Sequence, residues 1–241
     1  MTCRVAPRAC FKTPCMIELI NINKSFGGKR ILSNVSLSVR GGEIVGIAGP
    51  VGAGKSTLLH ILTGLLEPDS GTITLLGLPL QSSRQIIAKE MNYASSSQRL
   101  GGYASVAENL TTYADLYGVP HFRPIITNLW KLCKMPDVLM SKKIYKLSSG
   151  ENSFVNFTKA ILNNPRLLFL DEITAHMDPL LSQRVLTVIK KRNRKTNTTI
   201  IISQNTEEVR RTCTRMIILY HGKIVYDGKP IQNNKINTYY A

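Results

Sequence analysis

A glycine-rich segment at residues 49–56 constrains the fold more than any other part of the sequence. It reads Gly-Pro-Val-Gly-Ala-Gly-Lys-Ser and fits the pattern G-x-x-x-x-G-K-[ST] in full. The short apolar run Glu43–Ala48 precedes it, and Ser56–Leu66 follows with leucine and isoleucine at helical spacing. A strand, a glycine loop and a helix in this order predict an α/β protein whose loop binds phosphate.

Each residue type in this loop suits a nucleotide. Glycines let the backbone wrap closely around phosphate with its N–H groups pointing inward. The dipole of the following helix adds attraction for an anion. Lys55 is expected to reach the β- and γ-phosphates, and Ser56 to hold Mg²⁺. The loop residues predicted to contact ATP are Gly49, Pro50, Val51, Gly52, Ala53, Gly54, Lys55, Ser56 and Thr57.

A pair of acidic residues forms a second, independent element of the site. Leu167–Leu170 is an apolar run of buried-strand length, and Asp171 and Glu172 follow it directly. Carboxylates at the carboxyl edge of a parallel sheet face the ligand crevice. We expect Asp171 to complete the Mg²⁺ shell and Glu172 to orient or polarise the attacking water. Acidic residues often follow strands, so the pair gains its meaning from the glycine loop.

The other apolar runs predict a mainly parallel sheet that is interrupted by helices. Residues 104–160 mostly suit helices, and Pro120, Pro124 and Pro136 are expected to divide them into short ones. Apolar and polar residues alternate in Ile31–Val39, as in a half-buried antiparallel strand. The expected strands, besides the one before the glycine loop, are Ile17–Ile22, Ile31–Val39, Thr72–Leu76, Leu167–Leu170, Thr198–Ser203 and Met216–Tyr220.

Composition excludes several other classes of protein. The 241 residues are enough for a sizeable core, and no apolar stretch approaches the roughly 18–20 residues that span a bilayer, so a membrane role would need a partner. The net charge of +16 comes from 31 Lys and Arg against 15 Asp and Glu. These basic residues are scattered apart from Lys190–Lys195, which we interpret as a helix end. The five cysteines include no CxxC pair, which argues against a zinc site or a disulfide framework.

The first 15 residues differ from the rest. Met1–Cys15 holds three of the five cysteines and several basic residues, and it lacks the apolar stretch of a signal peptide. We expect a disordered extension, or an upstream start with Met16 as the true initiator. A basic organellar presequence is a further alternative.

Taken together, the motifs resemble the ATP-binding subunits of ABC transporters over nearly the whole chain from Met16 to about Lys229. Leu147–Glu151 is similar to the family's LSGGQ signature, with Ser and Glu in place of one Gly and the Gln. Met177-Asp178 resembles the D-loop. The resemblance implies that Ser148, Ser149 and Gly150 close over the γ-phosphate bound by the opposite subunit.

Phe26 falls where the family places an aromatic residue that stacks on adenine. The alternative for this side chain is an ordinary core phenylalanine.

Two positions depart from the family pattern. The family has a metal-contacting Gln after a strand, at a place that falls near Ser96 by count, whereas the nearest glutamine is Gln98. Either the loop is shifted or Gln98 is not that residue.

The family also places a switch His after the strand Thr199–Ile202, where this chain has Gln204. Because Gln cannot carry a charge or shuttle a proton, slow hydrolysis with persistent binding is the hypothesis.

The resemblance also implies the fold class and domain organisation. We expect a P-loop NTPase α/β core with a mainly parallel sheet, an N-terminal antiparallel β portion and a helical insertion subdomain. The ATP-binding domain would occupy residues 16–241. Its RecA-like core would comprise about 16–95 and 160–230, and its helical subdomain about 96–159.

Partners follow from the same resemblance. A homodimer or heterodimer of such subunits would sandwich two ATP molecules at the cytoplasmic face of a membrane, as a peripheral complex with a separately encoded integral membrane permease. Export-type systems are the nearest in appearance, and no nucleic acid is expected. Two rivals remain: a soluble ABC ATPase acting on ribosomes or nucleic acid, and a slow-cycling regulatory nucleotide binder.

Overall fold

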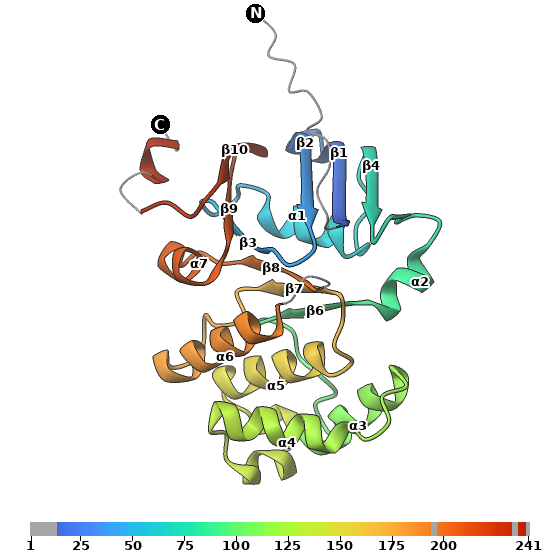
Figure 1. Cartoon of the computed structure of the whole chain (residues 1–241), viewed down its shortest axis with the longest axis vertical. Helices are drawn as coiled ribbons and strands as arrows, with labels where there is room; N and C mark the ends of the chain where they lie inside the picture. Colours follow the sequence, from blue (N-terminus) through green and yellow to red (C-terminus); the bar gives the residue numbers. More distant parts are fainter. Residues whose placement is uncertain (1–13, 194–196, 233–235, 240–241) are drawn as a thin grey trace, which may run out of the picture.

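Two β-sheets form the framework of the protein in the computed structural model, which describes residues 14–193, 197–232 and 236–239 (Figure 1). The expectation for Met1–Cys15 therefore falls almost wholly outside the described residues. The first sheet is antiparallel and has the order β2 (Lys29–Arg40), β1 (Cys15–Phe26), β4 (Ser70–Leu75) and β5 (Leu78–Pro79). The second has the order β10 (Lys223–Gly228), β9 (Arg215–Tyr220), β3 (Ile44–Ala48), β8 (Thr198–Ile202), β7 (Leu167–Asp171) and β6 (Met91–Ser95).

The five strands from β9 to β6 are parallel, and β10 runs antiparallel at the edge. Every residue of β3 and of β8 is buried, as expected for parallel strands that are covered on both faces. The mainly parallel sheet and the antiparallel N-terminal portion that the sequence predicts are confirmed.

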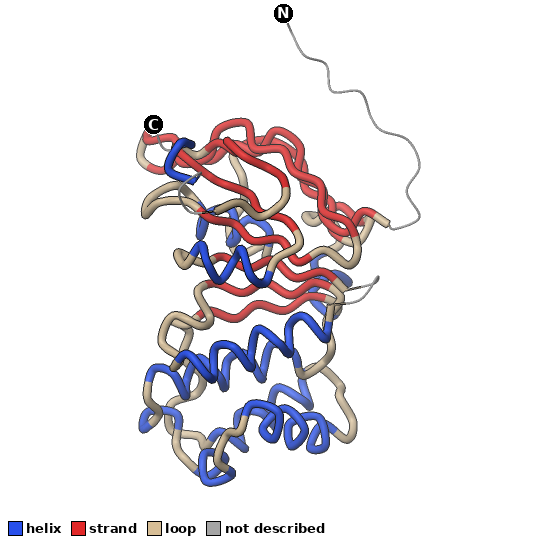
Figure 2. Tube along the Cα trace, turned by 60° about the vertical axis from the view of Figure 1, so that its left-hand side comes forward, coloured by secondary structure: helices blue, strands red, loops and turns tan. Residues whose placement is uncertain are grey.

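Helices cover both faces of the parallel sheet. Helix α1 (Lys55–Leu62) lies between the two sheets, and the helical region gathers at the opposite end of the molecule (Figures 1 and 2). The longer helices of that end are α3 (Val106–Leu116), α4 (Phe122–Cys133), α5 (Ser149–Ile161) and α6 (Pro179–Arg192). The remaining helical segments are α2 (Arg84–Lys89), α7 (Thr206–Thr212) and the 3₁₀ turns Asp137–Ser141, Ile144–Lys146 and Asn237–Tyr239.

The parallel sheet separates two hydrophobic cores. Along β7, Leu167 and Phe169 belong to the core shared with α1 and the antiparallel sheet, whereas Leu168 and Leu170 belong to the core shared with the helical region. This alternation follows from the two-residue period of a strand. In the second core, the rings of Trp130 and Phe154 pack edge to face with centroids 4.9 Å apart.

The structure differs from the sequence expectations at several boundaries. The helix expected to reach Leu66 ends at Leu62. Pro124 does not break a helix, because it lies in the first turn of α4, where a missing N–H costs no helical hydrogen bond. The helical expectation for 104–160 is otherwise matched by α3, α4 and α5. None of the described helices has both the length and the apolar character needed to cross a bilayer.

One basic side chain is buried where the helical region meets the sheet. Lys159 of α5 is 5% exposed, its Nζ donates to the Tyr93 carbonyl at 3.3 Å, and it lies 5.2 Å from the centre of the Tyr113 ring. Burial lowers the pKa of Lys159 from 10.5 to about 8. Well below pH 8 the folded protein carries this buried charge in full. Between pH 8 and 10.5 the unfolded chain binds more protons, so stability rises with pH there.

We predict that Lys159→Met raises the free energy of unfolding at pH 7 by about 1–2 kcal/mol, because it removes the cost of burying a charge. The variant also loses the rise in stability between pH 8 and 10.5. Urea unfolding at pH 7 and pH 10 measures both effects, with the exposed Lys131→Met as the control. Equal stability gains at the two pH values would contradict the assignment.

Candidate nucleotide site

The glycine loop connects the end of β3 to α1, as the sequence predicts. Gly49 and Gly54 have φ values of +153° and +101°, and both pack against backbone. A Cβ on Gly49 would lie 2.2 Å from the Leu219 carbonyl, and one on Gly54 would lie 3.0 Å from the Ile31 carbonyl. These two glycines are therefore required by the fold of the loop itself.

The loop presents a set of backbone donors that the protein does not use. Across the described chain, no protein acceptor receives the N–H groups of Gly52, Gly54, Lys55, Ser56 or Thr57. They lie at the start of α1, where the helix dipole favours an anion. Unused donors in this place fit the oxygens of a phosphate chain.

The Lys55 side chain folds back onto the glycine loop and bonds to its backbone. Its side chain is buried, and Nζ donates to the carbonyls of Gly49 at 2.7 Å and Pro50 at 2.9 Å. Burial lowers the pKa of Lys55, and the charges of Glu172 and Asp171 oppose that shift. The ammonium thus lies over its own loop, near both carboxylates, where a phosphate oxygen can replace the carbonyls as its partner.

Asp171 and Glu172 lie at the carboxyl end of β7, two strands from β3. Burial raises the pKa of Asp171 and the charge of Glu172 raises it further, while His60 and Lys55 oppose the shift. The structure therefore brings together the lysine of the loop and the two carboxylates that follow a distant strand. Ser56 follows Lys55 in the first turn of α1 and is exposed, and a metal contact by its hydroxyl stays a prediction.

Phe26 lies at the end of β1 and is 49% exposed. It is therefore not a core phenylalanine. Lys24 Nζ lies 5.4 Å from the centre of its ring. An exposed aromatic face can stack on a base, and adenine stacking stays a prediction.

Gln98 and Ser96 have different surroundings. The N–H of Ser96, the first residue after β6, donates to the Asp171 carbonyl at 3.2 Å. The carbonyl of Gln98 instead accepts from Asn152 and Asn156 of α5, at 2.8 and 2.6 Å, and its Oε1 is buried without a partner. The position that the count along the sequence gives, Ser96, is thus bonded to the backbone of Asp171. A metal contact by Gln98 stays a prediction.

The signature-like segment begins α5. Ser148 is the N-cap: its Oγ accepts from the Glu151 N–H at 3.2 Å, and Glu151 Oε2 accepts from the Ser148 N–H at 2.9 Å. Glu151 therefore completes a capping box, as a Gln would. Ser148 and Ser149 are exposed. Gly150 lies against the D-loop segment, because a Cβ there would be 2.7 Å from the His176 carbonyl.

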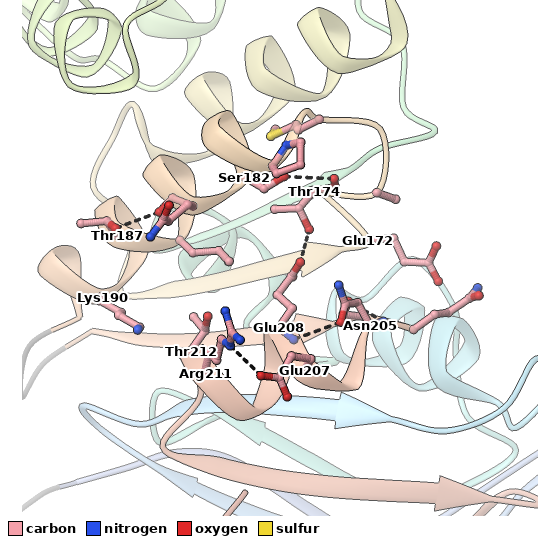
Figure 3. Close-up of a pocket in the computed structure, with 17 residues that line it drawn as sticks. Glu172, Thr174, Ser182, Thr187, Lys190, Asn205, Glu207, Glu208, Arg211 and Thr212 are labelled. Carbon is pink, nitrogen blue, oxygen red and sulfur yellow. Dashed lines mark hydrogen bonds and ion pairs between the residues drawn. The ribbon is translucent and has the colours of Figure 1, made fainter. Parts of the chain in front are cut away.

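Glu172 and Gln204 line a cavity of about 740 Å³ between α6 and α7 (Figure 3). Gln204 follows β8 and is exposed, and its role as the counterpart of the family's switch His stays a prediction. Two further residues meet in this cavity: Thr174 Oγ1 donates to Glu208 Oε2 at 2.5 Å. Sequence reasoning gave neither a role. Glu208 is the third residue after the Asn205 cap, a spacing that suggests only a capping partner.

The sequence of this chain matches the model of a known protein family. The family model described as "ABC transporter" matches residues 32–175, a range that includes the glycine loop, the signature-like segment and Asp171-Glu172.

Curated relatives include the Nod factor export ATP-binding protein I of Rhizobium sp. (strain N33), 30% identical over 216 residues that cover 89% of this chain and 71% of that protein. The protein of the same name from Burkholderia orbicola (strain AU 1054) is also 30% identical, over 89% and 71%.

Solved structures share the fold. One described as an ATP-binding subunit of an ABC transporter has a TM-score of 0.83 at 24% identity, and the alignment covers 89% of this chain and 90% of that chain. The ATP-binding cassette MJ0796, solved as a dimer in a post-hydrolysis state with ADP and Pi, has a TM-score of 0.79 at 23% identity over 90% of this chain and all of that chain.

We predict that Lys55→Ala weakens ATP binding about 100-fold, because charge-assisted hydrogen bonds to phosphate contribute about 1.5–3 kcal/mol each. Titration of the purified protein with a fluorescent ATP analogue measures the affinity. The exposed Lys131→Ala, on α4 and away from the glycine loop, serves as a matched loss of one positive charge and should bind like the parent chain. Retained affinity in Lys55→Ala would undermine the site.

Proposed function

The chain belongs to the ABC transporter family, and from this premise we propose that it is the ATP-binding and ATP-hydrolysing subunit that powers an export system. One observation carries the proposal: Lys55, the unused N–H groups of the glycine loop and the Asp171-Glu172 pair meet at one edge of the sheet. The names of its relatives as export ATP-binding proteins support the direction of transport.

The residues present suit a nucleotide with Mg²⁺. The loop N–H groups and Lys55 hold the phosphates, while the Ser56 hydroxyl and the Asp171 carboxylate provide the oxygen ligands that Mg²⁺ prefers. The ion, when bound, neutralises charge on the phosphate oxygens. Glu172 orients the attacking water and accepts its proton as the water oxygen bonds to the γ-phosphorus, while the bond from that phosphorus to the bridging oxygen breaks and ADP leaves. Phosphoryl transfer requires mainly positioning and charge stabilisation, which these side chains supply.

A second subunit completes the site. Ser148, Ser149 and Gly150 begin α5 at the surface, where the helix N-terminus favours an anion. These residues close over the γ-phosphate that a partner subunit holds in its own glycine loop. The partner is either a second copy of this chain or a related subunit, and the known dimer of the MJ0796 cassette supports this arrangement.

The transported substrate crosses through a separate membrane permease, on which the subunit docks peripherally at the cytoplasmic face. Residues around Gln98–Glu108, which join the sheet to the helical region, provide the docking contact. Co-purification of the tagged chain with an integral membrane protein tests this. Recovery with ribosomes or nucleic acid instead would overturn it.

Gln204 favours a second candidate function, a slow-cycling regulatory nucleotide binder. It lines the cavity beside Glu172 and offers only a neutral hydrogen bond there. Turnover of the purified chain separates the two functions, because a regulatory binder holds ATP without a catalytic cycle.

We predict that Glu172→Gln lowers kcat for ATP hydrolysis at least about 100-fold, because the amide cannot accept the proton of the attacking water. ATP affinity should stay within about threefold of the parent chain, since Glu172 does not hold the phosphates. Phosphate release and equilibrium binding measure the two quantities. Glu207→Gln, a surface change on α7, should alter neither, and unchanged turnover in Glu172→Gln would exclude this role.

We also predict that Gln204→His raises kcat about tenfold with little change in affinity, because an imidazole adds a group that can carry charge near the γ-phosphate. Steady-state turnover over pH 6–8 measures the gain. A variant no faster than the parent would count against slow hydrolysis through Gln204.

A further inference from the structure

Glu172 has an unusual backbone conformation. Its φ is +49°, in the left-handed region that costs a non-glycine residue about 1 kcal/mol or more. Its N–H donates to the Ile202 carbonyl at the end of β8, at 2.8 Å. A strained backbone conformation persists when neighbouring contacts hold it in place. The contacts of the residues that follow Glu172 therefore help to set the direction of its carboxylate.

Thr174, two residues after Glu172, is held by hydrogen bonds to several elements. It is 7% exposed. Its carbonyl accepts from the Met177 N–H at 3.0 Å and from Ser182 Oγ of α6 at 3.5 Å. Its hydroxyl donates to Glu208 of α7 at 2.5 Å. One residue, two positions after Glu172, thus links the segment to two helices.

Glu208 is the residue of α7 that accepts the hydrogen bond from Thr174. Its N–H donates to Asn205 Oδ1 at 3.1 Å, which ties it to the residue that follows Gln204. Burial raises the pKa of Glu208, and the hydrogen bond from Thr174 opposes that shift. Figure 3 shows the Glu208 side chain extending from α7 to Thr174. Glu207 instead pairs with Arg210 and Arg211 at 2.6 Å.

We propose that Thr174 and Glu208 are positioning residues: their hydrogen bond holds the Glu172 segment against α7 and sets the Glu172 carboxylate and Gln204 relative to each other. The inference rests on the proposed function, because the consequence is a rate of ATP hydrolysis. Neither side chain belongs to the glycine loop or to the residues assigned above to the phosphates and Mg²⁺. The bond should therefore affect the chemical step and leave ATP binding alone.

The test compares matched variants. Thr174→Val and Glu208→Ala, which break the bond, should lower kcat about 10–100-fold and leave KM for ATP within about threefold, since small misplacements of a catalytic group have effects of this size. Thr174→Ser and Glu208→Gln, which keep a donor and an acceptor, should restore most of the rate. The double variant, Thr174→Val with Glu208→Ala, should be no slower than the slower of the two single variants, because both changes remove the same hydrogen bond. Glu207→Ala on the same helix should match the parent chain.

Equal kcat in Thr174→Val and the parent would overturn the inference, as would a Thr174→Ser variant as slow as Thr174→Val. Hydrogen exchange gives a readout that needs no turnover. The amides of Ala175 and Met177, which bond to Glu172 and Thr174, should exchange faster in Thr174→Val, while those of β3 stay unchanged. A parent chain without ATPase activity would contradict the proposed function but not the positioning role. In that case, unchanged exchange of residues 175–177 in Thr174→Val would contradict the role of the Thr174–Glu208 hydrogen bond.

Discussion

The site depends on one constraint, the parallel pairing of β3, β8 and β7. Strands that share a direction end at the same edge of a sheet. The glycine loop after β3, Gln204 after β8 and Asp171 at the end of β7 therefore lie along the same edge, although they are far apart in the sequence. Every residue of β3 and β8 is buried, so these central strands are covered on both faces and hold the edge in place from within the core.

Much of this architecture could be predicted from the sequence because its signals are local. The glycine loop carries its own strand and helix, and runs such as Leu167–Leu170 mark buried strands by composition alone. Strand β6 gave no such signal, because Met-Asn-Tyr-Ala-Ser lacks β-branched residues. Among the described residues it is an edge strand that pairs with β7. The family pattern required a strand there, but the residues themselves did not indicate one.

Side-chain partners across elements could not be predicted in this way. Thr174 and Glu208 meet because α7 lies beside the segment after β7, a fact of tertiary packing. Glu151 shows the reverse case. Its replacement of a family Gln departs from the signature, yet the capping box with Ser148 is a local rule that either side chain satisfies. Local chemistry is thus visible in a sequence, and contacts between distant segments are not.

The two anchors of the loop after β6 limit where this protein can bend. The Ser96 N–H is bonded to Asp171 of the sheet, and the Gln98 carbonyl is bonded to Asn152 and Asn156 of α5. Within the loop, the Gln98 N–H donates to the Ser95 carbonyl at 3.2 Å, the Ser97 N–H donates to Ser95 Oγ at 3.3 Å, and the hydroxyls of Ser95 and Ser97 lie 2.9 Å apart, so the loop is a bonded turn. Because hydrogen bonds tie this turn both to α5 and to the backbone of Asp171, a displacement of α5 would be passed through the turn to the edge of the sheet at which the glycine loop also begins.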